Sequence, residues 1–86
     1  MKRWFLYILE CRGGAYYTGI TTDVVRRIDQ HNLGRGSRFT RGRIPVKLCY
    51  QEACRNRSEA LKREIIVKAL SKKRKEKLIK QNFIFS

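Results

Sequence analysis

The chain has 86 residues, enough for one small domain, and a domain of this size buries only about 60–65% of its unfolded surface. The formal net charge of +14 comes from 21 Lys and Arg against 7 Asp and Glu. This excess favours a polyanionic partner, with nucleic acid the first candidate. Because hydrophobic residues make up 42% and no tract is low-complexity, the composition excludes a disordered chain.

The sequence carries no signal for a membrane or secreted location. The apolar run Trp4 to Leu9 is too short for a signal-peptide core, and no stretch approaches the ~20 apolar residues of a membrane span. The basic segments also lack the long apolar face of a membrane-surface helix. We therefore expect a cytoplasmic protein with no membrane partner, and a monomer.

The three cysteines, Cys11, Cys49 and Cys54, are an odd number and do not indicate a disulfide framework. Cys49 and Cys54 are expected to be small apolar residues in or beside a strand. A zinc set of three cysteines with His31 is the disfavoured alternative, because no CxxC spacing supports it.

Two strands are predicted at the beginning of the chain. Residues 3–11 and 15–20 are rich in aromatic and branched side chains, and Arg12-Gly13-Gly14 supplies the turn of a hairpin. Both faces of the first strand are apolar, so the sheet needs helices on both sides. Gly19 lies on the same face as Tyr17, and its missing side chain leaves room for a close approach by substrate or backbone.

A helix is predicted from Thr22 or Asp23 to about Asn32. Its periodicity places Arg27 and His31 together on one edge of the inner seam and turns the neighbouring Arg26 to the far side.

The second half of the chain predicts a loop, a strand and two helices. Residues 33–43 hold four arginines and three glycines and read as a basic, flexible loop, and residues 46–53 form a third strand. Asn56-x-x-Glu59 opens a helix through Leu70; its apolar positions nearly encircle it, so it should be the most buried helix. Ser71 caps a last basic helix over 72–80, and the tail 81–86 either docks or frays.

These elements predict an α+β fold. A three-stranded antiparallel sheet is flanked by helices in the order β-β-α-β-α-α, within a single domain of residues 1–86 whose core spans about 3–80.

Polar side chains from three of these elements suggest a site. Tyr7 and Tyr17 come from two strands, and Arg27 and His31 come from a helix. Each taken alone has an ordinary structural explanation: strand tyrosines pack, arginines extend along apolar surface and histidines sit at rims.

Glu64, in the helix predicted to be most buried, is either an i,i+4 ion-pair partner of Lys68 or a metal ligand held by a rigid helix.

Three sequence runs resemble the GIY-YIG nuclease superfamily. They are Leu6-Tyr7-Ile8, Tyr17-Thr18-Gly19 and the run RRIDQHN at 26–32, and the run SEALKRE fits the acidic helix of the family. The resemblance covers about residues 3–80 and is closest to small stand-alone bacterial members and to the catalytic subunit of structure-specific branch-cutting endonucleases. The sequence FLY replaces GIY, YTG replaces YIG, and Ile20 stands where some repair nucleases carry lysine.

The resemblance implies a metal-dependent phosphodiesterase. Tyr17, assisted by Tyr7, would orient or deprotonate the attacking water, and Arg27 would stabilise the transition state. His31 would be an auxiliary base, or a donor to Tyr17 or the phosphate. Glu64 would hold a single divalent ion, Mg²⁺ or Mn²⁺, that polarises the phosphate.

The basic segments would bind backbone phosphates without reading sequence. The residues are Arg35, Arg38, Arg41, Arg43, Lys72, Lys73, Arg74 and Lys75. The resemblance and this charge together predict a DNA endonuclease, with RNA less favoured, that selects structure in repair or recombination or is targeted by a protein subunit. The alternative is a non-catalytic nucleic-acid-binding module on the same fold.

Overall fold

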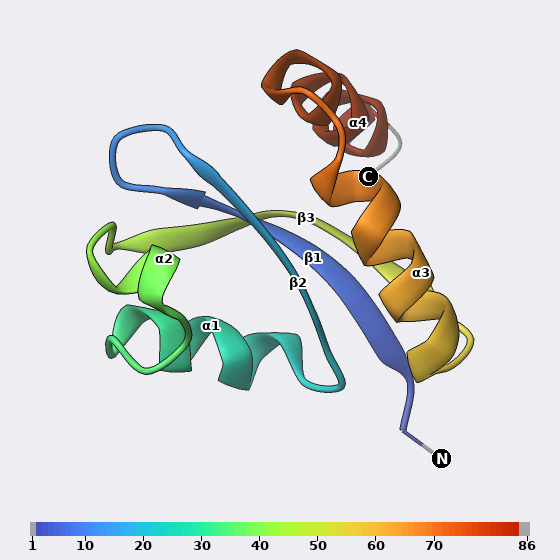
Figure 1. Ribbon diagram of the computed structural model, residues 1–86, viewed down its shortest axis with the longest axis horizontal. Helices are drawn as coiled ribbons and strands as arrows, with labels where there is room; N and C mark the ends of the chain where they lie inside the picture. Colours follow the sequence, from blue (N-terminus) through green and yellow to red (C-terminus); the bar gives the residue numbers. More distant parts are fainter. Residues whose placement is uncertain (1, 85–86) are drawn as a thin grey trace.

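The computed structural model describes residues 2–84 and confirms the predicted α+β fold, with one short helix added (Figure 1). The elements in chain order are β1 (Trp4–Cys11), β2 (Tyr16–Thr21), α1 (Val24–Asn32), α2 (Arg38–Arg41), β3 (Val46–Cys54), α3 (Arg57–Lys68) and α4 (Lys72–Ile84). None of the helices in this part of the chain is long and apolar enough to cross a bilayer.

Strand β1 is the centre of the molecule, because it pairs antiparallel with β2 on one side and β3 on the other. The register places Tyr7 opposite Gly19 of β2 and opposite Gln51 of β3. Alternate residues of β1 therefore pack into two separate cores. Leu6 and Ile8 face α3, and Tyr7 and Leu9 face α1.

The two faces are covered by different helices (Figure 1). Helix α1 and the short α2 lie on one side of the sheet, and α3 and α4 lie on the other. Asn32, at the end of α1, holds the start of β3: its Oδ1 accepts from the Val46 N–H at 2.7 Å and its Nδ2 donates to the Val46 carbonyl at 3.1 Å. Together these contacts fix α1 against the central sheet.

Helix α3, predicted to be the most buried helix, has two fully buried residues where α1 and α2 have one each, but it is not buried on nearly all sides as its apolar positions suggested. Only Ala60 and Val67 of α3 are buried, while Ile65 and Ile66 are 70% and 55% exposed. The helix lies on one face of a three-stranded sheet, so only the side of the helix that carries Ala60 and Val67 packs against the core. The apolar residues on its other side have no further layer to pack against within residues 2–84.

The segment 33–43 is not simply a flexible loop, because it contains α2. Ser37 caps this helix by accepting a hydrogen bond from the Thr40 N–H at 3.1 Å. Thr40 is fully buried, while the four arginines of the segment are exposed. Helix α4 continues through Ile84, so residues 81–84 of the predicted tail are helical. The last two residues of that tail, 85–86, lie outside the described residues.

Glycine is needed at position 19 because the Tyr7 ring packs directly against its backbone. A Cβ built on Gly19 would lie 2.6 Å from the Tyr7 hydroxyl oxygen and 2.7 Å from the Cζ of its ring. The space that the sequence suggested for substrate or backbone is therefore filled by the phenol of the facing strand, which lies across β2 at the edge of the sheet.

Substituting Gly19→Ala should destabilise the protein by about 1–3 kcal/mol, because the methyl group forces the buried Tyr7 ring to move. Gly42→Ala is the matched control: Gly42 has φ −89° and nothing lies within 4 Å of the position that a Cβ would take there, so the stability of this variant should stay near that of the parent. Urea unfolding of both variants checks this, and equal stabilities would contradict the packing argument.

Candidate active site

A buried chain of hydrogen bonds lies between β1 and α2. The Tyr7 hydroxyl is 3.0 Å from His31 Nε2, and His31 Nδ1 is 2.7 Å from the Thr40 hydroxyl. The Thr40 hydroxyl in turn lies 3.0 Å from the Ser37 hydroxyl. Tyr7, His31 and Thr40 are each at most 1% exposed. The imidazole is therefore behind the tyrosine, within the protein, rather than at the surface.

Arg27 is held beside this chain by the segment that follows α1. Its guanidinium donates to Gln30 Oε1 at 2.9 Å and to the Gly36 carbonyl at 3.0 Å. Arg27 is half-buried and Arg26 is exposed, as the helical periodicity predicted. One arginine of the pair is thus fixed toward the tyrosines, and the other faces solvent.

Tyr17 brings the second phenol to the same place from β2. Its ring centroid is 6.4 Å from that of Tyr7 and 5.0 Å from that of His31. On the outer side Tyr17 stacks on Phe39 of α2, with centroids 6.0 Å apart. The Arg43 guanidinium lies 4.0 Å over the Phe39 ring. A series of aromatic contacts, edge-on between His31 and Tyr17 and stacked between Tyr17 and Phe39, therefore leads from the buried imidazole to the exposed basic segment.

Glu64 approaches from the opposite layer of the fold. It lies on α3, its side chain is 18% exposed, and its carboxylate is 3.6 Å from Lys68 Nζ, which is the predicted i,i+4 pair. Its charge raises the pKa of Tyr7, so the carboxylate lies within electrostatic range of the phenol. Tyr50 and Arg63 both bond to Glu52, at 2.6 Å and 3.0 Å, and tie α3 to β3.

Burial dominates the titration of the two central groups. It raises the pKa of Tyr7 to about 12, against the lowering effect of the neighbouring Arg27. It lowers the pKa of His31 to about 4, and the charge of Arg27 acts in the same direction. At neutral pH the site therefore holds a protonated phenol beside an uncharged imidazole.

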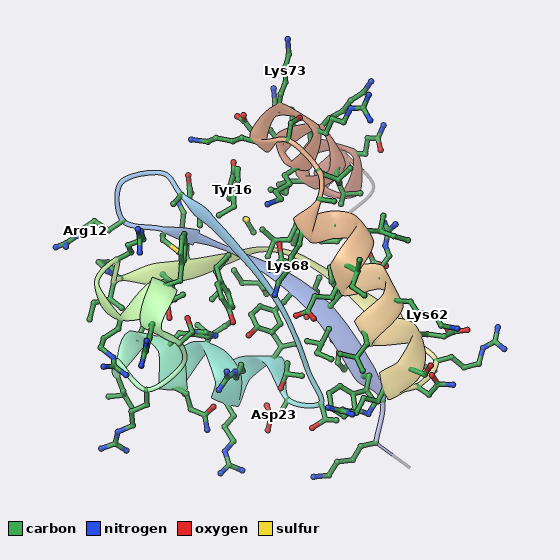
Figure 2. The ribbon with its side chains drawn as sticks, in the orientation of Figure 1. Arg12, Tyr16, Asp23, Lys62, Lys68 and Lys73 are labelled. Carbon is green, nitrogen blue, oxygen red and sulfur yellow. The ribbon has the colours of Figure 1, made fainter. Side chains whose placement is uncertain are left out.

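Two cavities open next to these residues. One of about 340 Å³ is lined by Arg27 with Arg26, Asp23 and Gln30 among others. A second, of about 240 Å³, is lined by Tyr16, Tyr17, Thr18, Phe39, Lys68 and Lys75. Figure 2 shows Lys68 directed from α3 toward the middle of the molecule, whereas Lys62 of the same helix points away.

The five predicted site residues come together to different degrees. Tyr7, Tyr17 and His31 touch one another, Arg27 acts on the pKa values of Tyr7 and His31, and Glu64 acts on Tyr7 through its charge. The predicted hydrogen bond of His31 to Tyr17 or to a phosphate is replaced by one to Tyr7, because the ring is fully buried.

The predicted phosphate-binding residues lie in two places. The four arginines around α2 are exposed, as are Lys72, Lys73 and Arg74. Lys75 is half-buried and lines the cavity beside Tyr17, while Lys73 lies against a separate hollow on α4. Their binding to nucleic acid stays a prediction.

Sequence reasoning missed three residues that hold the site. Gly36 supplies a carbonyl to Arg27, and a Cβ on Gly36 would collide with the His31 ring. Phe39 and Thr40 contact Tyr17 and His31. Phe39 was visible as the one aromatic residue of a basic segment, but Thr40 carries no signal in the sequence, because its contact depends on the packing of α2.

The cysteines belong to the core. Cys11 ends β1, Cys49 and Cys54 lie in β3 as predicted, and all three are free. Within residues 2–84, no group of three or more histidine, cysteine or acidic side chains is arranged to hold a metal ion.

Comparisons with known proteins match nearly the whole chain. A family model described as the GIY-YIG catalytic domain matches residues 3–78. A UPF0213 protein of Desulfotalea psychrophila is 55% identical over 78 residues, covering 90% of this chain and 71% of that protein. The solution NMR structure of a UPF0213 protein from Bacillus halodurans has 46% identity and a TM-score of 0.60, covering 92% and 84%. That of a protein from E. faecalis has 38% identity and a TM-score of 0.66, covering 98% and 90%.

The pKa of His31 predicts a loss of stability in acid. In the unfolded chain the histidine has a pKa of 6.5, whereas in the folded protein the pKa of His31 is about 4, so the folded protein binds this proton only at lower pH. Stability from this group is therefore complete above pH 6.5 and is lost as the pH falls toward 4, by on the order of 3 kcal/mol.

His31→Gln removes this titration, since His31 is the sole histidine of the chain. Urea unfolding of both proteins at pH 7.5 and pH 4.5 measures the effect. The parent should lose more stability than the variant between these two pH values, and parallel losses would show that His31 is not buried uncharged.

Proposed function

Because the chain belongs to the GIY-YIG nuclease family, we propose that it is a metal-dependent endonuclease that hydrolyses phosphodiester bonds in DNA and selects structure rather than sequence. The observation that carries this proposal is the cluster of two phenols, an imidazole and a guanidinium, from β1, β2 and α1, beside two open cavities. Hydrolysis of a phosphodiester needs a positioned water and stabilisation of the charge that develops on the phosphate.

The residues of the chain take distinct roles in this proposal. Tyr17, which lines a cavity, orients the attacking water, and Tyr7 accepts or passes the proton. Arg27, fixed by Gln30 and Gly36, donates to the phosphate oxygens as charge develops on them. His31 acts through Tyr7 as the proton acceptor inside the protein.

Glu64 is the residue that would hold the divalent ion. A half-buried carboxylate suits Mg²⁺, which keeps several waters and is bound by one or two carboxylates with substrate phosphates. The ion would polarise the phosphate and stabilise the leaving oxygen. Glu64 would exchange its pairing with Lys68 for this role, and Lys68 would then be free to contact a phosphate.

Removing Arg27 or Glu64 should abolish cleavage while leaving the fold intact. Flapped, branched and linear DNA are incubated with Mg²⁺ or Mn²⁺ and the cleavage rate is measured for Arg27→Ala and Glu64→Ala. We expect a loss of about 100-fold or more in each, because each removes charge stabilisation of the transition state.

Arg55→Ala is the control, since this arginine side chain is 83% exposed and lines neither of the two cavities, and it should cut at close to the parent rate. If the parent protein does not cut, or if both site variants cut as well as the control, the nuclease proposal fails. Salt-sensitive DNA binding that needs no metal and survives Glu64→Ala would then identify a non-catalytic binding module.

Lys75→Ala should weaken DNA binding by reducing the number of phosphate contacts beside the site. Measured by fluorescence anisotropy, the slope of log affinity against log salt should fall by about one per lost contact. Lys62→Ala removes the same charge from the outward side of α3 (Figure 2) and should leave the slope unchanged. Equal effects of the two substitutions would show that the basic charge acts diffusely and not along the cavity beside Tyr17.

A further inference from the structure

We propose that Thr40 is a positioning residue that holds uncharged His31 in the tautomer with its proton on Nδ1, so that Nε2 stays open to accept the proton of Tyr7. The inference rests on the proposed function for its catalytic meaning. Its structural half rests on the hydrogen-bond geometry alone.

The first step concerns which group accepts the hydroxyl proton of Tyr7. The phenol is buried, so its O–H needs an acceptor inside the protein. His31 Nε2, at 3.0 Å, is the acceptor in reach. The neighbouring Arg27 guanidinium, whose hydrogen bonding lowers the pKa of Tyr7, can only donate. If Nε2 carried a proton, two donors would face the phenol oxygen and the phenol proton would have no partner.

The second step is the other nitrogen of the ring. With Nε2 unprotonated, an uncharged imidazole carries its proton on Nδ1, and this proton needs an acceptor. The Thr40 hydroxyl oxygen lies 2.7 Å away and is fully buried. Thr40 can accept because its own proton has another destination, in the Ser37 hydroxyl at 3.0 Å or the Ser37 carbonyl at 3.4 Å.

The third step is that the surrounding backbone prevents the ring from turning away. Gly36 packs so closely that any Cβ at that position would collide with the imidazole. Because Ser37 caps α2 and accepts from the Thr40 N–H at 3.1 Å, the hydroxyl of Thr40 is fixed at the end of an ordered turn. The ring is thereby confined between the Tyr7 hydroxyl and the Thr40 hydroxyl.

In the proposed reaction these hydrogen bonds form a path for one proton. As the water attacks phosphorus, its proton passes to the Tyr7 oxygen while the Tyr7 proton passes to His31 Nε2. Tyr7 ends as a phenol, and His31 ends as an imidazolium that donates from Nδ1 to Thr40. The bond between phosphorus and the leaving sugar oxygen breaks as the water oxygen bonds to phosphorus, and the leaving oxygen takes a proton from solvent water. His31 then returns its extra proton to solvent through Tyr7, so charge and protons balance over the cycle.

The test reads the tautomer directly. His31 is the sole histidine in the sequence, so the ¹⁵N shifts of its two ring nitrogens at pH 7.5 identify which one carries the proton. The parent should show a protonated Nδ1 and an unprotonated Nε2. In Thr40→Val this preference should weaken by about 3–10-fold in the tautomer ratio, the loss expected for one neutral hydrogen bond. Thr40→Ser should restore it.

Thr18→Val is the matched control. Thr18 is the other buried threonine whose hydroxyl can be deleted, and among the described residues its Oγ1 is the one buried side-chain polar atom without a hydrogen-bond partner. Its substitution should leave the His31 shifts unchanged. A parent spectrum with the proton on Nε2, or identical tautomer ratios in the parent and Thr40→Val, would overturn the proposal.

A cleavage assay on the two Thr40 variants separates this inference from the proposed function. With DNA and Mg²⁺, Thr40→Val should cut about 10-fold more slowly with an altered pH profile, and Thr40→Ser should recover. A changed tautomer without any cleavage by the parent supports the role of Thr40 and contradicts the nuclease proposal. Normal cleavage and an unchanged pH profile in a variant whose tautomer has changed would show that the proton does not take this path.

Discussion

The buried hydrogen bond between Tyr7 and His31 is the interaction on which the rest of the site depends. Two polar side chains in the middle of a small core are costly unless each finds a partner. Tyr7 gains its partner by crossing over Gly19, and His31 gains a second one in Thr40. Gly19 of β2, together with Gly36 and Thr40 of the segment after α1, thus belongs to one packing arrangement, in which the satisfied pair also fixes the phenol beside Tyr17.

The segment after α1 serves both faces of this arrangement. Its exposed side carries arginines, while its buried side supplies the Gly36 carbonyl to Arg27 and the Thr40 hydroxyl to His31. Phe39 joins the two sides by stacking on Tyr17 beneath the Arg43 guanidinium. Because one ordered turn holds these groups, any contact of its arginines with a polyanion bears on the backbone that positions the proposed catalytic side chains.

The sequence predicted what depends on local periodicity and missed what depends on register and packing. Arg27 was separated from Arg26 because both lie on a regular helix, and the cap at Asn56 follows from its spacing to Glu59. The ring that fills the space over Gly19 depends on which residue of β1 pairs with it, and this register cannot be read from either strand alone. The burial of α3 was overestimated, because apolar positions such as Ile65 do not reveal whether another layer covers them. Helix α2, at four residues, is too short for a periodic signal.

In the resting protein, the pKa values of Tyr7 and His31 oppose the proton transfer proposed between them. The pKa of Tyr7 is raised to about 12 and that of His31 is lowered to about 4, so the shared proton stays on the phenol. The charge of Glu64 adds to this by raising the pKa of Tyr7. Neutralising Glu64 with a divalent ion would remove that contribution and lower the pKa of the phenol, in the direction that favours transfer to Nε2. If Glu64 holds the divalent ion as proposed, metal binding on α3 and proton transfer between β1 and α1 are coupled through Tyr7, although the two helices lie on opposite faces of the sheet.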